Sequence, residues 1–377
     1  MACHIRDAVS NDLTALLAIE NRCFHSDKIS RRSFKRYLVS EHSKLLVAEN
    51  DDLVVGYVLI WLHKGTRLGR IYSLAVLPEM RGKGIAEQLL TAIESVAKAD
   101  KRFYIRLEVA AKNQAAINLY EKLGYRVFGR FSAYYADSSD ALRMQKRIRA
   151  NTEQGAHLAA PWFRQTTEFT CGPASLIMAM SALAPKNKDW VKQELAIWRE
   201  ATTIFMTSGH GGCHPFGLAL AAHKRGFTSQ VMVNTDTPLF IDSVRDATKK
   251  QVIERVHYEM LSDCQHVGIN ISYQELNLEW LQAQLLKGHA VIVLISTYRF
   301  DGIKAPHWVL VTGIDDECVY VHDPDVNEPI QSDIDCQHLP VAIEAFQSMA
   351  AFGSQRLKTA VVVSSILSIH SQKVVIE

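Results

Sequence analysis

Four residues in the second half of the sequence have the chemistry of a thiol nucleophile and its partners. Cys171 stands directly before Gly-Pro and an apolar run, so we expect it near a helix N-terminus, where backbone amides and the helix dipole favour a thiolate. Gln165, six residues earlier, has a side-chain amide suited to binding an oxyanion. His307 opens a strand-like segment, and Asp323 follows sixteen residues later. A nucleophile, a base, an orienting carboxylate and an oxyanion donor together predict cysteine acyl-transfer chemistry.

Each of these residues also has a purely structural interpretation. A lone buried cysteine is usually inert, and Asp323 could do no more than shape a turn before Pro324. His322 could replace His307 as the base, since it directly precedes Asp323. The joint spacing favours the catalytic interpretation, because all four parts are present.

The segment His210-Gly-Gly-Cys213-His214 suggests a metal site at first sight. Its glycines are typical of a mobile loop, however, and the only additional nearby ligand is His223. We therefore expect no metal, and a loop that borders the Cys171 cleft with Cys213 as a candidate second reactive thiol.

Residues 81–86, Arg-Gly-Lys-Gly-Ile-Ala, connect a strand-like segment to a helix-like one in the first half. Gly82 and Gly84 permit close backbone approach, so amides at the helix start can bind an anion such as a pyrophosphate. Arg81 and Lys83 add positive charge. The two glycines alone would fit a plain connecting loop about as well.

Alternating strands and helices are predicted around this loop. Strand-like segments span residues 45–48, 54–62, 71–76 and 104–109, and helix-like segments span residues 85–98 and 114–123, the latter closed by Gly124. After a weakly patterned stretch at residues 149–160, helix-like segments dominate up to residue 287, and strand-like ones follow at residues 291–296, 308–312, 319–322 and 359–364. The pattern predicts an α/β domain, a linker and an α+β domain.

Size and composition agree with two globular domains. The chain has 377 residues, 48% of them hydrophobic and 22% charged. Residues 1–150 carry 25 Lys and Arg against 16 Asp and Glu, whereas the remainder carries 17 against 24. A basic first half suits a phosphate-bearing ligand and attraction to the acidic half, although two solvated surfaces of different composition explain the counts equally well. Nucleic-acid binding is not favoured, because no basic tract is interleaved with aromatic residues.

The expected location of the protein in the cell rests on signals that the sequence does not show. The N-terminus shows no apolar signal region, and the longest apolar run, residues 290–295, is too short to span a bilayer. The seven cysteines are scattered, without a Cys-x-x-Cys pair, which argues against a disulfide framework or a structural zinc site. We expect a cytoplasmic protein without a membrane segment.

The first half, roughly residues 4–148, resembles the GNAT family of acetyl-CoA-dependent N-acetyltransferases, and most of all the branch that acetylates protein N-termini, such as the ribosomal-protein alanine acetyltransferases. Residues 81–86 stand where that family has its pyrophosphate loop, and Asn113 and the Leu119-Tyr120 pair match a later family segment. Tyr134-Tyr135 and residues 140–144 are similar to the closing strands of that branch. The resemblance implies a mixed central sheet flanked by helices.

The resemblance also implies roles for individual residues. The cofactor, acetyl-CoA or another acyl-CoA, would contact a strand splayed from its neighbour at Leu74, Ala75 and Val76, together with Arg81, Gly82, Lys83, Gly84, Ile85, Ala86, Asn113 and Tyr120. Tyr120 would protonate the departing thiolate, unless it is only a packing aromatic. Glu108 would accept the amine proton through water, unless it forms an ion pair with Arg106 or Lys112.

The second half resembles the peptidase C39 family and its C39-like relatives, which are cysteine peptidases of papain-like fold. The resemblance is carried by Gln165, by residues 171–174 (Cys-Gly-Pro-Ala), by His307-Trp308 and by residues 322–324 (His-Asp-Pro), whereas residues 189–279 match loosely. Well-known members remove double-glycine leaders while fused to export transporters. That substrate class does not carry over, because no transporter or membrane segment is present here.

The sequence therefore predicts a GNAT domain at residues 1–149, a linker at residues 150–160 and a papain-like peptidase domain at residues 161–377. We expect a bifunctional enzyme whose partners are a peptide or protein substrate and an acyl-CoA. Two alternatives stay open. The thiol site could be a transpeptidase or acyltransferase, or the first domain could be a non-catalytic acyl-CoA sensor that gates the peptidase.

Overall fold

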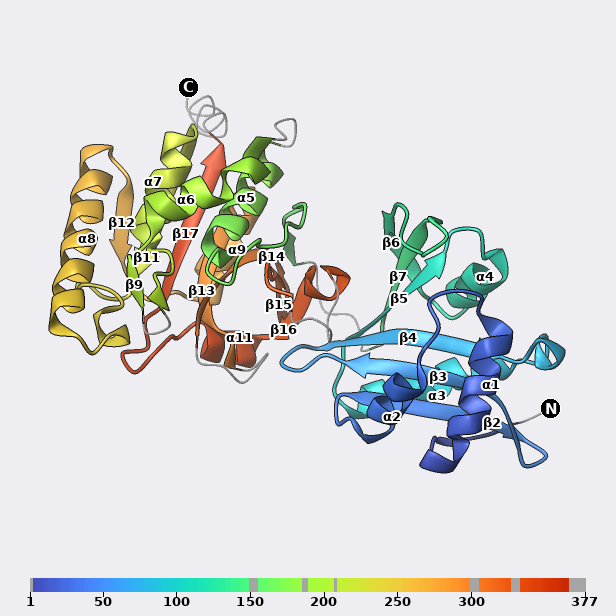
Figure 1. Cartoon of the computed structure of the whole chain (residues 1–377). Coiled ribbons are helices and arrows are strands. Elements are labelled where there is room, and N and C mark those ends of the chain that lie inside the picture. Colours follow the sequence, from blue (N-terminus) through green and yellow to red (C-terminus); the bar gives the residue numbers. More distant parts are fainter. Residues whose placement is uncertain are drawn as a thin grey trace, which may run out of the picture. The chain divides into compact units, whose positions relative to one another are not determined.

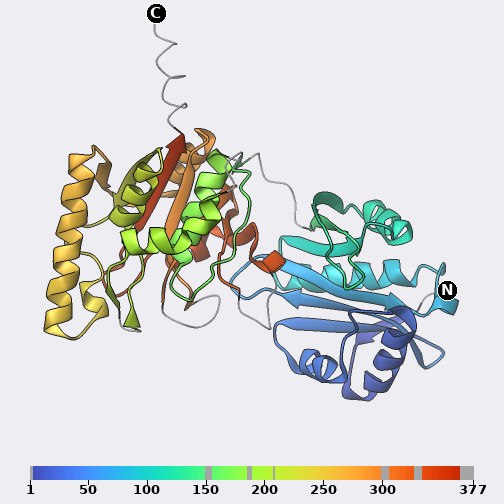
Figure 2. The ribbon, with the colours of Figure 1, turned by 45° about the horizontal axis from the view of Figure 1, so that its top comes forward.

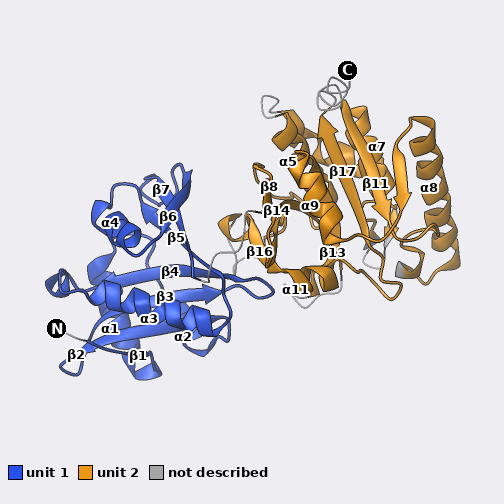
Figure 3. Cartoon of the chain, turned by 180° about the vertical axis from the view of Figure 1, so that it is seen from behind, with its two compact units in different colours: residues 1–151 blue, residues 152–377 orange. Residues whose placement is uncertain are grey.

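The computed structural model describes residues 3–148, 155–184, 189–206, 209–298, 305–326 and 333–365. The chain divides into two compact units, residues 1–151 and 152–377 (Figure 3). The part of the predicted linker before residue 155, residues 150–154, lies outside the described residues. Its later part belongs to the second unit, because Ala156 and His157 form a short strand that pairs with Ile314 and Gly313.

The first unit is built on a mixed sheet with the strand order β1-β2-β3-β4-β5-β7-β6. Its strands are β1 (His4–Asp7), β2 (Ser43–Asn50), β3 (Leu53–Leu62), β4 (Leu68–Val76), β5 (Tyr104–Ala110), β6 (Arg126–Phe131) and β7 (Ala141–Arg147). Neighbouring strands are antiparallel except for β4 and β5, which run parallel. The predicted strands and the mixed sheet are confirmed.

Helices cover both faces of this sheet (Figure 1). One face carries α1 (Leu13–Cys23) and α2 (Arg31–Val39), and the other carries α3 (Ile85–Ala99) and α4 (Gln114–Lys122). In α3 the apolar residues recur every four positions, and Ile85, Leu89, Ile93 and Ala97 are all buried. Burial of a side chain such as Leu89 contributes about 2 kcal/mol, so this stripe fixes the helix that follows the glycine loop.

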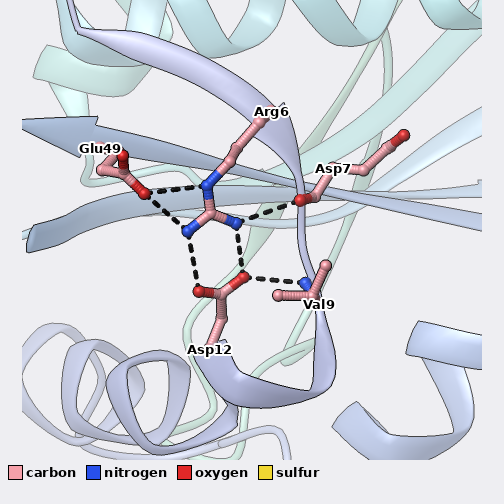
Figure 4. A network of polar contacts seen from close by, with 5 residues as sticks. All are labelled: Arg6, Asp7, Val9, Asp12 and Glu49. Atoms are coloured by element: carbon pink, nitrogen blue, oxygen red, sulfur yellow. Dashed lines mark hydrogen bonds and ion pairs between the residues drawn. The ribbon is translucent and has the colours of Figure 1, made fainter. Parts of the chain in front are cut away.

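A polar network fixes the first strand to the rest of the sheet (Figure 4). The Arg6 guanidinium donates to both carboxylate oxygens of Asp12, at 2.7 and 2.9 Å, and its Nε and Nη2 donate to Glu49 Oε2 at 2.9 and 2.7 Å. Asp12 also accepts from the backbone N–H of Val9 at 2.8 Å. These hydrogen bonds lower the pKa of Asp12, with Arg6 the largest cause. The network therefore joins β1, the following helical turn and β2.

The second unit has a larger sheet with the strand order β12-β11-β17-β13-β14-β15-β16, and β8 pairs with β14 outside this path. Its strands are β8 (Ala156–His157), β11 (Phe227–Val233), β12 (Asn270–Tyr273), β13 (Ala290–Ser296), β14 (Pro306–Ile314), β15 (Cys318–His322), β16 (Leu339–Ala342) and β17 (Thr359–Ser365), and a separate hairpin joins β9 (Phe205–Met206) to β10 (Gly209–His210). Its helices are α5 (Cys171–Leu183), α6 (Glu194–Ala201), α7 (Pro215–Lys224), α8 (Ala247–His266), α9 (Leu278–Leu286) and α11 (Ile343–Met349).

The core of this unit lies between α5, α7 and one face of the sheet (Figure 2). Ten successive residues of α5, from Cys171 to Met180, are buried, so the helix is apolar on all sides. The four strands predicted in this half correspond to β13, β14, β15 and β17. The sequence did not indicate β11 and β12, a parallel pair whose connection contains α8. Helices and strands therefore interleave in this unit, which is mixed α/β. No helix in the described ranges is long and apolar enough to cross a bilayer.

Candidate active sites

Cys171 is the first residue of α5 and is buried. The helix is tied to β14 by Ser175, whose Oγ donates to the Trp308 carbonyl at 3.0 Å. A Cβ added at Gly172 would lie 2.9 Å from Cys213 Cβ and 3.2 Å from Trp308 Cδ1. Only glycine therefore allows the first turn of α5 to approach Cys213 and Trp308 this closely, which explains the Cys-Gly pair.

His307 and Asp323 are brought together by the antiparallel strands β14 and β15. His307 Nε2 lies 2.7 Å from Asp323 Oδ1, and both side chains are largely buried. The turn that begins at Asp323 is fixed by two hydrogen bonds of the Asp323 backbone. The Asp323 carbonyl accepts from Trp162 Nε1 at 2.7 Å, and the Asp323 N–H donates to the Cys336 carbonyl at 2.9 Å. The predicted base and its orienting carboxylate therefore form a hydrogen-bonded pair.

The electrostatics of His307 connect this pair to the thiol. Burial lowers the pKa of His307, but the charge of Asp323 and the neighbouring Cys171 outweigh burial and raise it well above its ordinary value. Because Nε2 faces Asp323, Nδ1 is the ring nitrogen available to Cys171. An imidazolium held between a carboxylate and a sulfur favours the thiolate, which is the nucleophilic form.

Gln165 lies beside the same carboxylate turn. Its backbone N–H donates to the Pro324 carbonyl at 2.9 Å, and its Nε2 donates to Asp325 Oδ1 at 3.1 Å. Its Oε1 is buried and has no hydrogen-bond partner among the described residues. The next residue, Thr166, is fixed by the buried carboxylate of Glu194, which accepts from its N–H at 2.8 Å and from its Oγ1 at 2.7 Å. The contact to Asp325 was not predicted, although Asp325 stands only two residues after Asp323.

The alternative base and the second thiol both have other roles. His322 donates from Nε2 to the Ala160 carbonyl at 3.0 Å, and its Nδ1 accepts from the His338 N–H at 2.8 Å, so neither nitrogen is available as a base. Cys213 is buried, and burial together with the nearby Cys171 raises its pKa well above the ordinary value. Burial and the raised pKa of Cys213 argue against the interpretation of this residue as a second reactive thiol.

The other residues of the 210–214 segment also have separate partners. His214 Nε2 lies 3.0 Å from His257 Nδ1 in a buried pair. The His210 ring lies 4.8 Å from the Phe169 ring, between centroids. Within the part of the chain that the structure describes, no cluster of three or more His, Cys, Asp or Glu residues could hold a metal ion.

In the first unit, β4 and β5 diverge next to the predicted cofactor residues. Their parallel pairing covers Leu68, Gly69 and Arg70 and ends there. Directly afterwards, a bulge in the β3–β4 pairing inserts one extra residue, Tyr72, and bends β4. Leu74, Ala75 and Val76 follow on the divergent part of the strand, with their pairing directed to β3. The structure therefore contains a splayed strand at the predicted position.

The glycine loop opens onto solvent at the start of α3. Gly82 and Gly84 have φ angles of +74° and +78°, a conformation that favours glycine, and an added Cβ would meet nothing closer than 3.9 Å. Arg81, Lys83 and both glycines are exposed, whereas Ile85 is buried and Ala86 is half-buried. The Arg81 Nε donates to the Val76 carbonyl at 3.2 Å, which joins the loop to the end of β4. An anion can therefore reach the amides of the first helical turn.

Glu108 lies on β5 beside the splay and is held by arginines. Its Oε2 accepts from Arg70 Nε at 2.9 Å, and its Oε1 lies 3.8 Å from Arg143 Nε. Arg70 in turn donates to the Tyr134 hydroxyl at 3.1 Å. The alternative to a catalytic role was an ion pair of Glu108 with Arg106 or Lys112, but Lys112 pairs with Asp137 instead. The pair with Arg70 was not predictable from spacing, because the parallel register of β4 and β5 creates it.

Tyr120 lies within α4, and Asn113 is the N-cap of the same helix. Tyr120 is buried in the apolar cluster that contains α3 and α4, and burial raises its pKa to about 12. The side chain of Asn113 caps α4 by accepting from the Ala116 N–H at 3.2 Å. Tyr120 therefore keeps its proton at neutral pH, as a general acid must, while Asn113 has a structural role in addition to any contact with a cofactor.

Two family models match the chain. The model described as the Acetyltransferase (GNAT) family matches residues 11–125. The model described as the Peptidase_C39 like family matches residues 160–364. The two matches fall in different structural units.

Curated relatives are similar to the first unit. The N-terminal acetyltransferase A complex catalytic subunit NAA10 of Arabidopsis thaliana is 36% identical over 157 residues, which span 40% of this chain and 79% of the relative. The N-terminal acetyltransferase B complex catalytic subunit NAA20 of the same plant is 36% identical over 154 residues, or 40% of this chain and 88% of the relative. Among solved structures, the ribosomal-protein-S18-alanine N-acetyltransferase from Escherichia coli is 24% identical, covers 41% of this chain and 98% of its own, and has a TM-score of 0.37.

Proposed function

The chain belongs to the GNAT acetyltransferase family through its first unit and to the peptidase C39-like family through its second, and we propose that it is a cytoplasmic bifunctional enzyme. Residues 1–149 transfer an acyl group from acetyl-CoA, or another acyl-CoA, to an amine of a peptide or protein. Residues 161–377 form a papain-like, thiol-dependent peptidase. The acceptor is an N-terminal amine, because the curated relatives are named as catalytic subunits of N-terminal acetyltransferases.

The peptidase assignment rests on one observation, the His307–Asp323 pair at 2.7 Å next to a cysteine that begins a buried helix. Cys171 attacks the carbonyl carbon, and His307 gives its proton to the leaving amine. A water that His307 deprotonates then hydrolyses the thioester. Gln165 and the backbone N–H of Cys171 stabilise the oxyanion, with each donor contributing about 3 kcal/mol.

The acyltransferase site fits an acyl-CoA because its loop is open and its strand is splayed. The exposed residues Arg81 to Gly84 and the amides of Ile85 and Ala86 hold the pyrophosphate, and the backbone of residues 74–76 binds the pantetheine arm. Bound acetyl-CoA supplies the activated acyl group. Tyr120 protonates the departing thiolate, and Glu108 accepts the amine proton through a water at its Oε1, the oxygen that has no hydrogen-bond partner among the described residues.

Two measurements test the two activities separately. Intact-mass analysis with iodoacetamide should give one fast adduct that Cys171→Ala removes, and the same variant should abolish cleavage of a peptide mixture. Incubation of the full chain with acetyl-CoA and peptides with free N-termini should add one acetyl group per peptide. If wild type and Cys171→Ala cleave equally, the thiol mechanism is wrong.

We further propose that the two activities act in sequence on one peptide. The peptidase cleaves the peptide and exposes a new N-terminal amine, which the acyltransferase then acetylates. When a cleavable peptide is incubated with the enzyme and acetyl-CoA, the fragment that begins at the new N-terminus should carry the acetyl group. A product that is cleaved but never acetylated at this end contradicts the coupling, while each separate activity stands.

The ion pair between Glu108 and Arg70 favours a second candidate for the first unit. A carboxylate engaged by arginine is a weaker base, so this unit would bind an acyl-CoA as a sensor and gate the peptidase. Under this alternative, no peptide is acetylated, and acetyl-CoA changes the rate of peptide cleavage in wild type and in Tyr120→Phe alike.

A further inference from the structure

The turn Asp323-Pro324-Asp325 joins two parts of the thiol site that are distant in sequence. Asp323 Oδ1 accepts from His307 Nε2 at 2.7 Å and from the Asp325 N–H at 2.9 Å. On the other side of the turn, Asp325 Oδ1 accepts from Gln165 Nε2 at 3.1 Å, and the Pro324 carbonyl accepts from the Gln165 N–H at 2.9 Å. The carboxylate that orients the base and the amide that faces the oxyanion are therefore held by three consecutive residues.

We propose that Asp325 is a positioning residue that fixes the side-chain amide of Gln165 for oxyanion binding. The inference rests on the proposed thiol chemistry and adds a residue to it. Asp325 itself does not touch the reacting atoms, because it acts through Gln165.

The orientation of the amide follows from the chemistry of its partner. An ionised carboxylate only accepts hydrogen bonds, so Nε2 and not Oε1 of Gln165 must face Asp325. The reversed amide would bring two oxygens to the 3.1 Å separation. Nε2 carries two hydrogens, so one bonds to Asp325 and the second is left for the oxyanion.

The buried Oε1 of Gln165 shows that this orientation needs support. The oxygen has no hydrogen-bond partner among the described residues, and burial of an acceptor without a donor is unfavourable. An amide with no anchor would therefore rotate or flip. The carboxylate of Asp325 opposes this, because it discriminates between the two ends of the amide, whereas an amide in its place would pair with either end.

Two small reagents separate oxyanion stabilisation from thiol reactivity without knowledge of the peptide substrate. With p-nitrophenyl acetate, the Cys171 thiolate attacks the ester carbonyl, an oxyanion forms, and p-nitrophenolate leaves as the thioester is made. With iodoacetamide, the same thiolate displaces iodide, and no oxyanion forms. Both adducts are quantified at Cys171 by mass spectrometry, with the Cys171→Ala background subtracted.

Asp325→Asn should slow acylation of Cys171 about 3- to 10-fold, and Gln165→Ala should slow it about 100-fold, the cost of losing one oxyanion donor. Alkylation by iodoacetamide should stay within about twofold of wild type in both variants, since it does not use the donor. Asp333→Asn is the matched control, because Asp333 is an exposed carboxylate 3.6 Å from Arg164, the neighbour of Gln165. It should leave both rates unchanged.

A double-mutant cycle decides whether Asp325 acts through Gln165. In the Gln165→Ala background, Asp325→Asn should have no further effect on acylation. Multiplicative effects of the two substitutions, or an Asp325→Asn variant that is acylated as fast as wild type, would overturn the positioning role. If wild-type Cys171 is alkylated but never acylated, the proposed function itself fails, which is a different and recognisable result.

Discussion

Asp323→Asn tests the ion pair on which the thiol site depends. The substitution keeps the volume of the side chain and a hydrogen-bond acceptor for His307 Nε2, but it removes the negative charge. With Nε2 and Oδ1 2.7 Å apart, the charge centres lie about 4 Å apart, which corresponds to about 4 kcal/mol at an effective dielectric constant of 20. Part of this is lost to solvent, since 12% of the Asp323 side chain is exposed. We therefore expect the imidazolium to lose about 2 kcal/mol of stabilisation.

At 1.36 kcal/mol per tenfold change, a loss of about 2 kcal/mol shifts the balance between thiolate–imidazolium and neutral pair about 30-fold toward the neutral form. The pKa of His307, which Asp323 helps to raise, should fall accordingly. The alkylation rate of Cys171 by iodoacetamide at pH 6.5 should then fall by up to about 30-fold, while the rates of variant and wild type converge in strongly alkaline solution, where the thiol ionises without help.

The assay is the pH dependence of Cys171 alkylation, followed by intact mass. Asp325→Asn is the control for a nearby loss of charge, because we expect it to change acylation and leave the alkylation profile unaltered. A rate for Asp323→Asn at pH 6.5 within about twofold of wild type would refute the ion-pair reasoning. It would mean that Asp323 only shapes the turn before Pro324.

Three further predictions concern other parts of the chain. Gly172→Ala places a methyl group 2.9 Å from Cys213 Cβ and should lower the free energy of urea unfolding by about 1–3 kcal/mol. Cys213→Gly in the same chain should restore most of this free energy. An unchanged free energy of unfolding in Gly172→Ala would mean that α5 can shift freely. Tyr120→Phe should lower acetyl transfer to a peptide about 100-fold at neutral pH with unchanged stability, and an unaltered rate would exclude Tyr120 as the acid. Burial lowers the pKa of His257 to about 4 and that of His214 well below its ordinary value. The second unit should therefore lose stability as the pH falls from about 6.5 to about 4, by about 3 kcal/mol for His257 alone, and His257→Gln should flatten the urea midpoints over this range.

Local patterns in the sequence carry a large part of the fold. The four-residue spacing of apolar side chains predicted α3, and the buried apolar runs predicted β13 and β14. The segment of β11, Phe-Thr-Ser-Gln-Val-Met-Val, and the four residues of β12 have no such pattern, because they depend on pairing with each other and, for β11, with β17. Strands that are stabilised mainly by pairing with distant strands have weak sequence patterns and are therefore hard to predict.

The same distinction applies to the sites. The residue types and spacing of Cys171, His307 and Asp323 predicted that these residues act together. In the structure His307 and Asp323 are joined by a hydrogen bond. Contacts created by packing were not predictable. Glu108 meets Arg70 because parallel strands align residues that are 38 positions apart, and Gln165 meets Asp325 across 160 positions. The spacing of residues in the sequence indicates candidate catalytic groups. Their hydrogen-bond partners are determined by contacts between distant segments and cannot be read from spacing.

The environment of each cysteine, more than its residue type, determines which thiol can react. All seven cysteines are thiols that form no disulfide. Burial raises the pKa of Cys264 to about 12 and holds that of Cys213 and Cys336 well above the ordinary value. Cys171 is buried to a similar degree, but it begins a helix and lies against an imidazole whose other nitrogen faces a carboxylate. Cys213 lies beside Gly172, the residue after Cys171, but it neither begins a helix nor lies against His307. We therefore expect the two thiols to differ in reactivity, because Cys171 begins a helix and lies against His307.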